Sequence, residues 1–257
     1  MTTTAPTMQG LAGKRAIVTG GASGIGRASA LRLMAEGCIV GIFDLDGAGA
    51  RETIAQSGAD KSKAAAYQVD IGDYAEVERA VADFEAAMGP IDLLANIAGW
   101  DKASPFLKST RDLWDKVIRI NLYGPLNMHH VVVRGMAGRG FGRVVTIASD
   151  AGRAGSSGEA VYSACKGGMI SFTKTLAREL ARRGVTLNVV CPGPTDTPLF
   201  ASFGDPGLKE ALARAIPLGR LGRPDDYPGI IAFLLSDDAK FITGQTISVS
   251  GGLTMHG

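Results

Sequence analysis

The chain has 257 residues, of which 46% are hydrophobic and 20% are charged, a composition typical of a globular protein with a substantial core. Its formal net charge of +2 argues against nucleic acid or an anionic membrane surface as a partner. No apolar run approaches the ~18 residues that a membrane span needs, and residues 1–10 lack the basic start and apolar core of a signal peptide. We therefore expect a soluble, cytoplasmic enzyme or binding protein whose partner is a small molecule and neither nucleic acid nor a membrane.

The three cysteines, Cys38, Cys165 and Cys191, lie far apart in apolar or helical stretches. Neither their spacing nor that of the three histidines matches a metal-ligand pattern. We expect buried free thiols and no metal site.

Short apolar or β-branched runs alternate with longer helical segments. The predicted strands are residues 15–19, 38–43, 64–69, 91–97, 143–148, 185–190 and 245–250. The predicted helices lie near residues 24–36, 47–57, 73–88, 110–138, 160–183 and 224–236. Most of the strands are continuously apolar, as strands covered on both faces are. The alternation predicts a single α/β domain over residues 11–257, a Rossmann-like, doubly wound, seven-stranded parallel sheet with helices on both faces, preceded by a flexible tail over residues 1–10.

Two segments depart from this regular pattern. Gly124 and Pro125 fall inside the predicted helix 110–138 and predict a kink there. Residues 194–216 are rich in Pro, Gly, Thr and Phe and have no strand pattern. Because a loop of that length in a compact domain is usually functional, we interpret residues 194–216 as a substrate lid.

A glycine-rich turn follows the first predicted strand. In "TGGASGIGRASA", Gly20, Gly24 and Gly26 have the spacing G-x-x-x-G-x-G, and a helix begins directly behind them. Glycine allows the tight turn and lets the backbone approach a pyrophosphate, which the free N–H groups of the helix N-terminus would bind. Between a strand and a helix, this pattern predicts a dinucleotide site that also includes Ser23 and Ile25.

An acidic residue stands at the end of the second predicted strand and another at the end of the third. Asp44, in "GIFDLD", can accept hydrogen bonds from the adenosine ribose hydroxyls and would repel a 2′-phosphate, unless it is only a turn residue or cap. That repulsion is about 4 kcal/mol at ~4 Å and an effective dielectric of ~20, so we expect NAD to be preferred over NADP by about tenfold or more. Asp70 can reach the adenine amino group or cap the next helix. Leu45 and Ile71, which follow the two acids, are assigned to the same site.

A tyrosine and a lysine lie one turn apart in "AVYSACKGG". Tyr162 and Lys166 stand at positions i and i+4, so on a helix their side chains leave the same face. The spacing by itself does not distinguish an ordinary pair from an acid–base device.

From about residue 11 to the end, the chain resembles the short-chain dehydrogenase/reductase family. Six motifs in the expected order carry the resemblance: "TGGASGIG", "NIAG", "INLYG", "TIAS", "YSACK" and "CPGPTDT". It implies proton transfer by the tyrosine–lysine pair during hydride exchange with NAD, and the catalytic residues Asn121, Ser149, Tyr162 and Lys166.

The resemblance also implies a role for each of these four residues. Tyr162 would take the alcohol proton, and Ser149 would hydrogen-bond the substrate oxygen unless it is merely a satisfied hydroxyl at a strand end. Lys166 would bind the nicotinamide ribose and, together with the positive nicotinamide, lower the pKa of the phenol from ~10 by several units. Asn121 would hold a water in a proton relay, or else only cap a local kink.

Further cofactor contacts follow from the same resemblance. The family usually has a second asparagine where this chain has Ile97, but the contact there is largely through the backbone. The family threonine that touches the nicotinamide amide maps onto Thr197 or Thr195, and both hydroxyls could instead cap the lid segment. The cofactor contacts predicted in these two motifs are Asn96, Ala98, Gly99, Pro192, Gly193, Thr195 and Thr197.

Apolar side chains edge the expected substrate cleft and favour a ring or a short aliphatic chain over a sugar. These side chains are Trp100, Phe106, Leu199, Phe200 and Phe203, although plain core packing would account for the same aromatic residues. Asp150 and Ser156 are the polar residues assigned to the cleft.

A longer resemblance is to the 2-hydroxycyclohexanecarboxyl-CoA dehydrogenases, carried by "NIAGWD", "MHH", "IASDAGRAGSSGEAVYSACKGG", "VVCPGPTDT" and "SDDAKFITGQTISVSGGLTMHG". It implies a cyclic 2-hydroxyacyl-CoA as the substrate, oxidised with NAD, and CoA phosphates near Arg153, Lys209 and Arg214. The alternatives are a dehydrogenase or carbonyl reductase of free cyclic or aryl alcohols and ketones, a 3-oxoacyl-carrier-protein reductase, which usually prefers NADPH, and a non-catalytic NAD-binding sensor. Because the family commonly forms tetramers, we expect a homotetramer.

Overall fold

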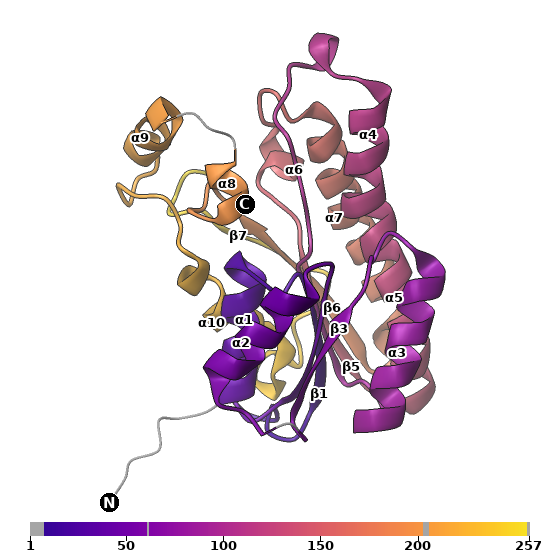
Figure 1. The fold of residues 1–257 in the computed structure, drawn as a ribbon. Helices are drawn as coiled ribbons and strands as arrows, with labels where there is room; N and C mark the ends of the chain where they lie inside the picture. Colours follow the sequence, from indigo (N-terminus) through magenta and orange to yellow (C-terminus); the bar gives the residue numbers. More distant parts are fainter. Residues whose placement is uncertain (1–7, 61, 203–205, 256–257) are drawn as a thin grey trace, which may run out of the picture.

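The chain folds around one parallel sheet in a computed structural model that describes residues 8–60, 62–202 and 206–255. Within these residues the strand order is β3-β2-β1-β4-β5-β6-β7 (Figure 1). The strands are β1 (Arg15–Thr19), β2 (Ile39–Asp44), β3 (Ala64–Gln68), β4 (Leu93–Asn96), β5 (Gly142–Ile147), β6 (Val185–Pro192) and β7 (Thr246–Val249), all paired in parallel. The predicted seven-stranded sheet is confirmed. Its winding reverses between β1 and β4, and open α/β sheets bind ligands at the carboxyl ends of the strands beside such a switch point.

Helices connect the strands and pack on both faces of the sheet. They are α1 (Gly24–Ala35), α2 (Gly47–Ser57), α3 (Tyr74–Met88), α4 (Arg111–Ile118), α5 (Gly124–Arg139), α6 (Ala151–Ala154), α7 (Ala160–Leu180), α8 (Pro198–Ala201), α9 (Pro206–Ala215) and α10 (Pro228–Leu235). Shorter turns are η1 (Phe106–Lys108), η2 (Arg119–Tyr123), η3 (Ala181–Arg183), η4 (Pro224–Asp226) and η5 (Asp237–Ala239).

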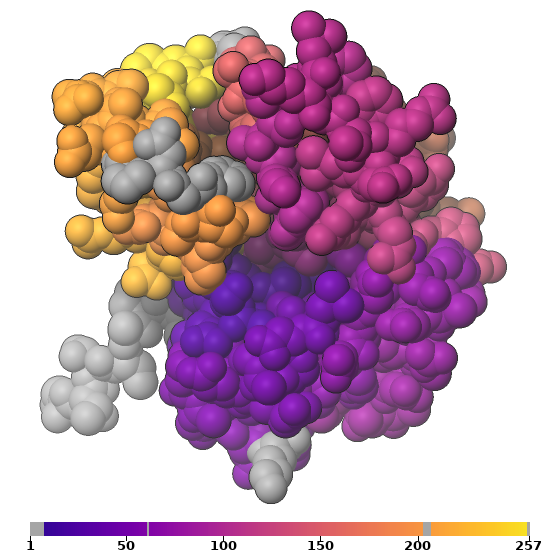
Figure 2. Space-filling model, turned by 45° about the horizontal axis from the view of Figure 1, so that its top comes forward, coloured from indigo at the N-terminus to yellow at the C-terminus, as the bar shows by residue number. Residues whose placement is uncertain are grey.

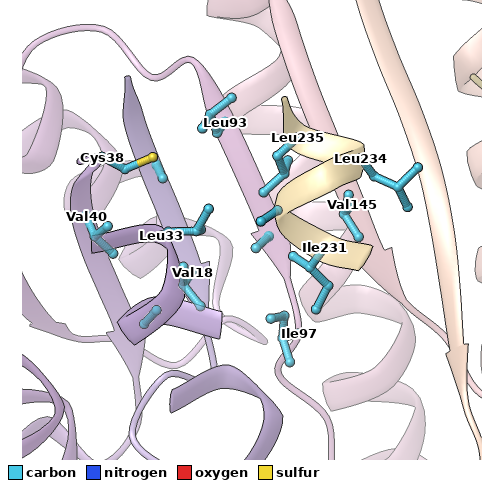
Figure 3. Close-up of a cluster of buried hydrophobic side chains, with 14 of the residues drawn as sticks. Val18, Leu33, Cys38, Val40, Leu93, Ile97, Val145, Ile231, Leu234 and Leu235 are labelled. Atoms are coloured by element: carbon cyan, nitrogen blue, oxygen red, sulfur yellow. The ribbon is translucent and has the colours of Figure 1, made fainter. Parts of the chain in front are cut away.

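Two apolar cores hold the helices against the sheet. On one face, α1, α2 and α10 bury residues such as Leu33 and Ile231 against Val18 of β1 (Figure 3). On the other face, α3, α5 and α7 bury residues such as Phe84 and Met128. Removing one such side chain from water stabilises the fold by about 1.5–3 kcal/mol. The continuously apolar strands in the sequence are therefore the middle layer of this sandwich.

The predicted helix 110–138 is divided by the wider turn η2, a π-helical turn with i→i−5 bonds. Pro125 has no N–H, so it cannot donate the usual i→i−4 bond to the carbonyl of Asn121. The Gly124 N–H bonds instead to the carbonyl of Arg119, five residues back. Gly124 also permits a close approach, because a Cβ there would lie 2.7 Å from the side chain of Ile71. The kink expected from the glycine–proline pair thus takes the form of a π turn.

The lid segment, residues 194–216, is more helical than a loop prediction implies. It contains α8 and α9, and residues 203–205 lie outside the described part of the chain. Thr197 caps α8 by accepting the N–H of Phe200, and Pro198 occupies the first position of the helix, where its missing N–H has no consequence. Closure of this segment over a substrate stays a prediction.

The N-terminal tail predicted over residues 1–10 extends too far. The Met8 N–H donates to the Glu36 carboxylate at 2.8 Å, and the Gln9 carbonyl accepts the N–H of Asp237 at 2.9 Å. Leu11 is fully buried in the core. These contacts attach residues 8–10 to the body of the protein, whereas residues 1–7 lie outside the described residues.

All three cysteines are buried free thiols, as predicted. None of the helices in the described residues combines the length and the apolar character that crossing a membrane would take.

Candidate active site

A cavity of about 720 Å³ opens at the carboxyl ends of the central strands. It lies in the hollow between the orange lid segment and the magenta segment near residues 100–120, above the indigo glycine turn (Figure 2). Its lining includes most of the predicted site residues, which come together from all parts of the chain: Gly20, Ser23, Gly24, Ile25, Gly26, Asp44, Leu45, Asp70, Ile71, Ala98, Gly99, Trp100, Ser149, Asp150, Ser156, Tyr162, Lys166, Pro192, Gly193, Thr195, Thr197, Leu199 and Phe200.

The glycine turn brings backbone, rather than side chains, to the cavity. Gly20 has φ +70°, and a Cβ on Gly26 would lie 2.0 Å from the Gly20 carbonyl oxygen, so neither position tolerates a side chain. Ser23 precedes α1 with extended backbone and forms no side-chain cap. The first N–H groups of α1 therefore keep their positive potential for a bound anion.

Asp44 is oriented by the backbone at the end of β2. Its carboxylate accepts the N–H of Ala22 at 2.9 Å and the N–H of Asp46 at 2.9 Å. These two bonds hold the carboxylate at the edge of the cavity, and each oxygen keeps a further lone pair for a hydroxyl donor. Asp44 therefore does not cap α2, because the carboxylate of Asp46 does so by accepting the N–H of Gly49.

Asp70 lines the cavity but does not cap α3. The cap is Asp73, whose carboxylate accepts the N–H of Glu76 at 3.0 Å. Asp70 accepts the N–H of Gly72 at 2.8 Å and forms an ion pair with Arg119 at 2.7 Å. The capping alternative for Asp70 is wrong, and the residue links the end of β3 to the π turn η2.

Asn121 does not line the cavity with its side chain. It is fully buried, and its side-chain amide donates to the carbonyls of Trp100 at 2.6 Å and Val117 at 3.0 Å. Its amide oxygen accepts the N–H of Trp100 at 3.3 Å. The side chain thus fixes the segment after β4 against the helix pair α4–α5.

Asn96 is also buried, within a polar network that does not reach the cavity. Its amide oxygen and the Thr19 hydroxyl lie 3.1 Å apart, and its amide nitrogen lies 3.3 Å from His129 Nδ1. His129 in turn contacts the Pro125 carbonyl through Nδ1 at 2.7 Å and the Thr146 hydroxyl through Nε2 at 3.1 Å. The cofactor contact predicted for Asn96 is therefore not made by its side chain, which instead joins β1, β4, β5 and α5.

The buried imidazole predicts a loss of stability in acid. Burial lowers the pKa of His129 to about 4, below the ~6.5 of an unfolded histidine. The unfolded chain therefore binds the extra proton first, and the contribution that is present above pH ~6.5 is lost as the pH falls towards 4, up to about 3 kcal/mol. Urea unfolding at about pH 7.5 and about pH 4.5 should show this excess loss in the wild type. We expect His129→Gln to lose less of its free energy of unfolding in acid than the wild type, and the exposed His130→Gln to lose as much as the wild type. An equal loss in all three proteins would contradict the prediction.

Tyr162 and Lys166 share one face of α7 and meet at the cavity with Ser149. The Lys166 Nζ lies 5.5 Å from the centre of the Tyr162 ring and donates to the Ile147 carbonyl at 3.1 Å. The Ser149 hydroxyl oxygen accepts the N–H of Ala151 at 3.1 Å, which leaves its own proton free to donate. The three side chains predicted as catalytic on this wall therefore face the same space.

Burial and nearby carboxylates set the electrostatics that the polypeptide alone gives this wall. Burial, followed by the nearby carboxylates of Glu159 and Asp101, raises the pKa of the Tyr162 phenol, while a hydrogen bond with Ser149 acts in the opposite direction. Burial lowers the pKa of Lys166 to about 8. The polypeptide by itself therefore disfavours the phenolate, because desolvation outweighs the nearby ammonium group.

The two candidate threonines are held within the lid segment. The Thr195 hydroxyl lies 2.5 Å from the Tyr227 hydroxyl and donates to the Gly193 carbonyl at 2.8 Å. The Thr197 hydroxyl accepts the N–H of Phe200 at 3.2 Å as the cap of α8. The capping alternative is confirmed for Thr197, whereas Thr195 fixes the start of the segment.

On the substrate side, Trp100, Leu199 and Phe200 line the cavity together with the exposed Ser156. The side chain of Asp150 makes a structural hydrogen bond. Its carboxylate accepts the hydroxyl of Ser248 at 2.5 Å, so it ties the turn after β5 to β7.

One of the aromatic residues expected in the apolar wall is not found there, and a second cannot be placed. Phe106 stacks on Trp114, with ring centres 5.2 Å apart, and is not part of the cavity lining. Phe203 lies outside the described residues. The apolar wall therefore rests on side chains from the loop after β4 and from α8.

The three basic residues expected near CoA phosphates have partners elsewhere. Arg153 donates to the Ser248 hydroxyl at 2.8 Å, Lys209 pairs with Asp196 at 2.6 Å, and Arg214 lies 4.0 Å from Glu210. None of the three lines the cavity.

Three charged residues of the cavity lining were not among the predicted site residues: Asp101, Glu159 and Lys116. The Lys116 Nζ lies 4.0 Å above the centre of the Trp100 ring. The i, i+3 spacing between Glu159 and Tyr162 on the same helix end was a signal that could have found Glu159. Asp101 had no such signal, because it approaches Glu159 only through the folded chain.

Comparison with known proteins places these features in a family. The family model described as enoyl-(acyl carrier protein) reductase matches residues 20–254. The acetoacetyl-CoA reductase of Shinella zoogloeoides is 43% identical over 238 residues, which cover 92% of this chain and 97% of the relative. The 3-oxoacyl-[acyl-carrier-protein] reductase of Salmonella typhimurium is 37% identical over 244 residues, which cover 95% of this chain and 98% of the relative.

Two solved structures have the same fold. The 3-ketoacyl-(acyl-carrier-protein) reductase from Brucella melitensis, complexed with NADH, has a TM-score of 0.89 at 32% identity and covers 95% of this chain and 100% of its own. Levodione reductase has a TM-score of 0.90 at 32% identity and covers 93% of this chain and 96% of its own. The chain therefore belongs to the short-chain dehydrogenase/reductase family, a family of oxidoreductases.

Proposed function

We propose that the protein catalyses the reversible, NAD-dependent oxidation of a secondary alcohol to a ketone, with a cyclic 2-hydroxyacyl-CoA such as 2-hydroxycyclohexanecarboxyl-CoA as its substrate. One observation carries the proposal. The Tyr162–Lys166 pair and the Ser149 hydroxyl line the same cavity as the glycine turn at the N-terminus of α1. A proton-transfer group and a dinucleotide cradle thus share one space.

The residues present fit a nicotinamide dinucleotide. The glycine turn leaves a cradle that side chains would fill, since a Cβ on Gly20 would lie 2.8 Å from Ala98 Cα. The N-terminus of α1 would hold the pyrophosphate, and Asp44 would accept the adenosine ribose hydroxyls. A Cβ on Gly99 would lie 3.4 Å from the Lys166 Nζ. The glycine therefore leaves room beside this ammonium group, so that it can reach a ribose. NAD, when bound, supplies the hydride acceptor.

The side chains around the cavity would handle the proton and the developing charge. Ser149 donates to the substrate oxygen and stabilises the charge that grows on it. Tyr162 would accept the proton of the alcohol O–H while the hydride leaves the carbon that bears this oxygen. Because burial raises the pKa of Tyr162, this transfer needs the positive charge that an oxidised nicotinamide adds to that of Lys166.

For Asn121 the structure supports a main-chain role. Its side chain is occupied by Trp100 and Val117, but Pro125 cannot donate to its carbonyl. We propose that this carbonyl, at the π turn, holds the water of the proton relay.

The relatives support a thioester with an oxygen function two carbons from the acyl carbon. The names of the acetoacetyl-CoA reductase and the 3-oxoacyl-[acyl-carrier-protein] reductase give such substrates. A cyclic 2-hydroxyacyl-CoA has the same arrangement within a ring. The second candidate is reduction of 3-oxoacyl carrier protein, favoured by the same relatives. The use of NADH does not separate the two, since the Brucella melitensis reductase was solved with NADH.

The substrate is best tested by comparing specificity constants. Purified protein with NADH would be given 2-oxocyclohexanecarboxyl-CoA, acetoacetyl-CoA, an acetoacetyl carrier protein and cyclohexanone. We expect the cyclic CoA ester to give the highest kcat/KM. A preference for the carrier protein would favour the second candidate, a preference for cyclohexanone a free-ketone reductase, and NADH binding without turnover of any compound a sensor.

We also propose a cytoplasmic homotetramer, as the family resemblance implies. Exposed apolar side chains near the C-terminus, among them Phe241 and Met255, support burial against further copies.

A further inference from the structure

Two carboxyl groups meet on the wall of the cavity beside Tyr162. Asp101 lies in the loop after β4, and Glu159 directly precedes α7. The Ser104 N–H donates to the Gly158 carbonyl at 2.8 Å and so binds the two segments together. Both acids line the cavity with Tyr162. Backbone contacts thus bring the two carboxyl groups together.

The environment of Asp101 favours a proton on this pair of acids. Asp101 is only 4% exposed, and no donor in the described residues bonds to its Oδ2. It lies close enough to Glu159 for the two groups to interact. Two ionised carboxylates repel each other and can only accept hydrogen bonds, so this arrangement is favourable when one of the two groups holds a proton.

The groups around the pair do not neutralise it. Burial and the charge of Glu159 raise the pKa of Asp101 to about 7, while Lys166 acts in the opposite direction. Tyr162 and Cys165 also face Asp101, and neither carries a positive charge. The pair therefore changes from about one negative charge to two as the pH rises through neutrality.

Both cations that the protein places in the described lining already have a partner, so besides the charge that an oxidised nicotinamide would add, none is left over for a second anion near the phenol. In the described lining, the cations are Lys116, which lies over Trp100, and Lys166, which donates to Ile147. A carboxylate on the carbon next to the reacting one would enter this negative field.

We propose that Asp101 and Glu159 form a specificity-determining pair that admits an uncharged acyl derivative, such as a thioester or ester, beside the reacting carbon and excludes the free carboxylate. The proposal rests on the proposed function and names the substrate class within it. The protonated member of the pair can donate to the acyl oxygen of an ester or thioester, whereas a carboxylate substrate meets like charge. Over a separation of ~4–7 Å, that repulsion corresponds to a loss of kcat/KM of about tenfold to 10³-fold.

The test compares one substrate that carries this negative charge with two uncharged derivatives of it. 2-Hydroxycyclohexanecarboxylate, its methyl ester and its N-acetylcysteamine thioester would be oxidised with NAD at about pH 6 and about pH 8.5, a range in which the free acid stays ionised. The proteins are the wild type, Asp101→Asn, Glu159→Gln and the double variant. Asp112→Asn/Asp115→Asn, which removes two charges from the exposed side of α4, is the matched control. Circular dichroism and NADH binding would confirm that each variant is folded.

The wild type should prefer the ester and thioester to the acid by more than about tenfold, and this ratio should rise with pH. Asp101→Asn should make the ratio independent of pH, Glu159→Gln should weaken its rise with pH, and the double variant should reduce it by about tenfold or more at both pH values. The control should behave as the wild type.

Two different failures can be told apart. A wild type that oxidises the acid as well as the ester, or a double variant that keeps the full ratio, would overturn the pair as the determinant while the proposed oxidation stands. A wild type that binds NADH but oxidises none of the three compounds would overturn the proposed function and, with it, this inference.

Discussion

Replacing Tyr162 by phenylalanine is expected to lower kcat/KM by about 10³-fold, the size of effect that a positioned general acid–base group supplies. The change removes the phenol oxygen and keeps the ring, so the packing at the start of α7 should survive. Thermal unfolding and NADH binding should stay close to those of the wild type. The measurement is steady-state oxidation of a secondary alcohol by both proteins at saturating NAD.

The matched control is Tyr123→Phe, which removes a phenol oxygen from an exposed side chain at the π turn. We expect it to keep the wild-type rate. Activity of Tyr162→Phe within about tenfold of the wild type would assign proton transfer to another group, since a general acid–base role is worth more than that.

Replacing Asp44 by alanine should change the choice of cofactor. The carboxylate would hold the ribose hydroxyls of NAD and repel a 2′-phosphate. Its loss should therefore weaken the binding of NAD and remove the repulsion that opposes the binding of NADP. Together these effects should move the ratio of the two kcat/KM values towards NADP by about tenfold to 10³-fold, because a like-charge contact at ~4 Å is worth about 1 kcal/mol in water and about 4 kcal/mol at an effective dielectric of ~20. Kinetics with each cofactor at a fixed alcohol concentration would measure the ratio.

Asp83→Ala serves as the control for this prediction, because it removes one exposed carboxylate from α3, outside the cavity lining. It should leave the ratio unchanged. If Asp44→Ala also leaves it unchanged, Asp44 does not contact the cofactor, and its two backbone hydrogen bonds are its whole role.

Much of the site could be predicted because its signals are local. The glycine spacing between β1 and α1 depends on backbone conformation over a few residues, and the Tyr162–Lys166 pair depends on the pitch of one helix. The same holds for the division of the predicted helix 110–138, where Pro125 removes a single hydrogen bond. Such features need no knowledge of distant contacts.

Predictions about what each polar side chain contacts were less successful, because a side chain bonds to whatever the folded chain brings near it. Asn96 and Asn121 stand in the expected motifs, yet both are buried in structural hydrogen bonds. Arg153, expected near a phosphate, bonds to Ser248 on β7. The motif located these residues correctly but could not identify their partners.

The sequence by itself determined the order of strands and helices, the parallel sheet and the place of the glycine turn, because apolar periodicity and glycine and proline geometry act over short stretches of chain. Only the tertiary structure decided the electrostatics of the cavity. The pKa of Tyr162 is raised by burial, by Glu159 three residues before it, and by Asp101, which reaches it from the loop after β4. Desolvation and charge–charge interaction depend on distance in space, and that distance exists only once the loop after β4 has packed against the start of α7.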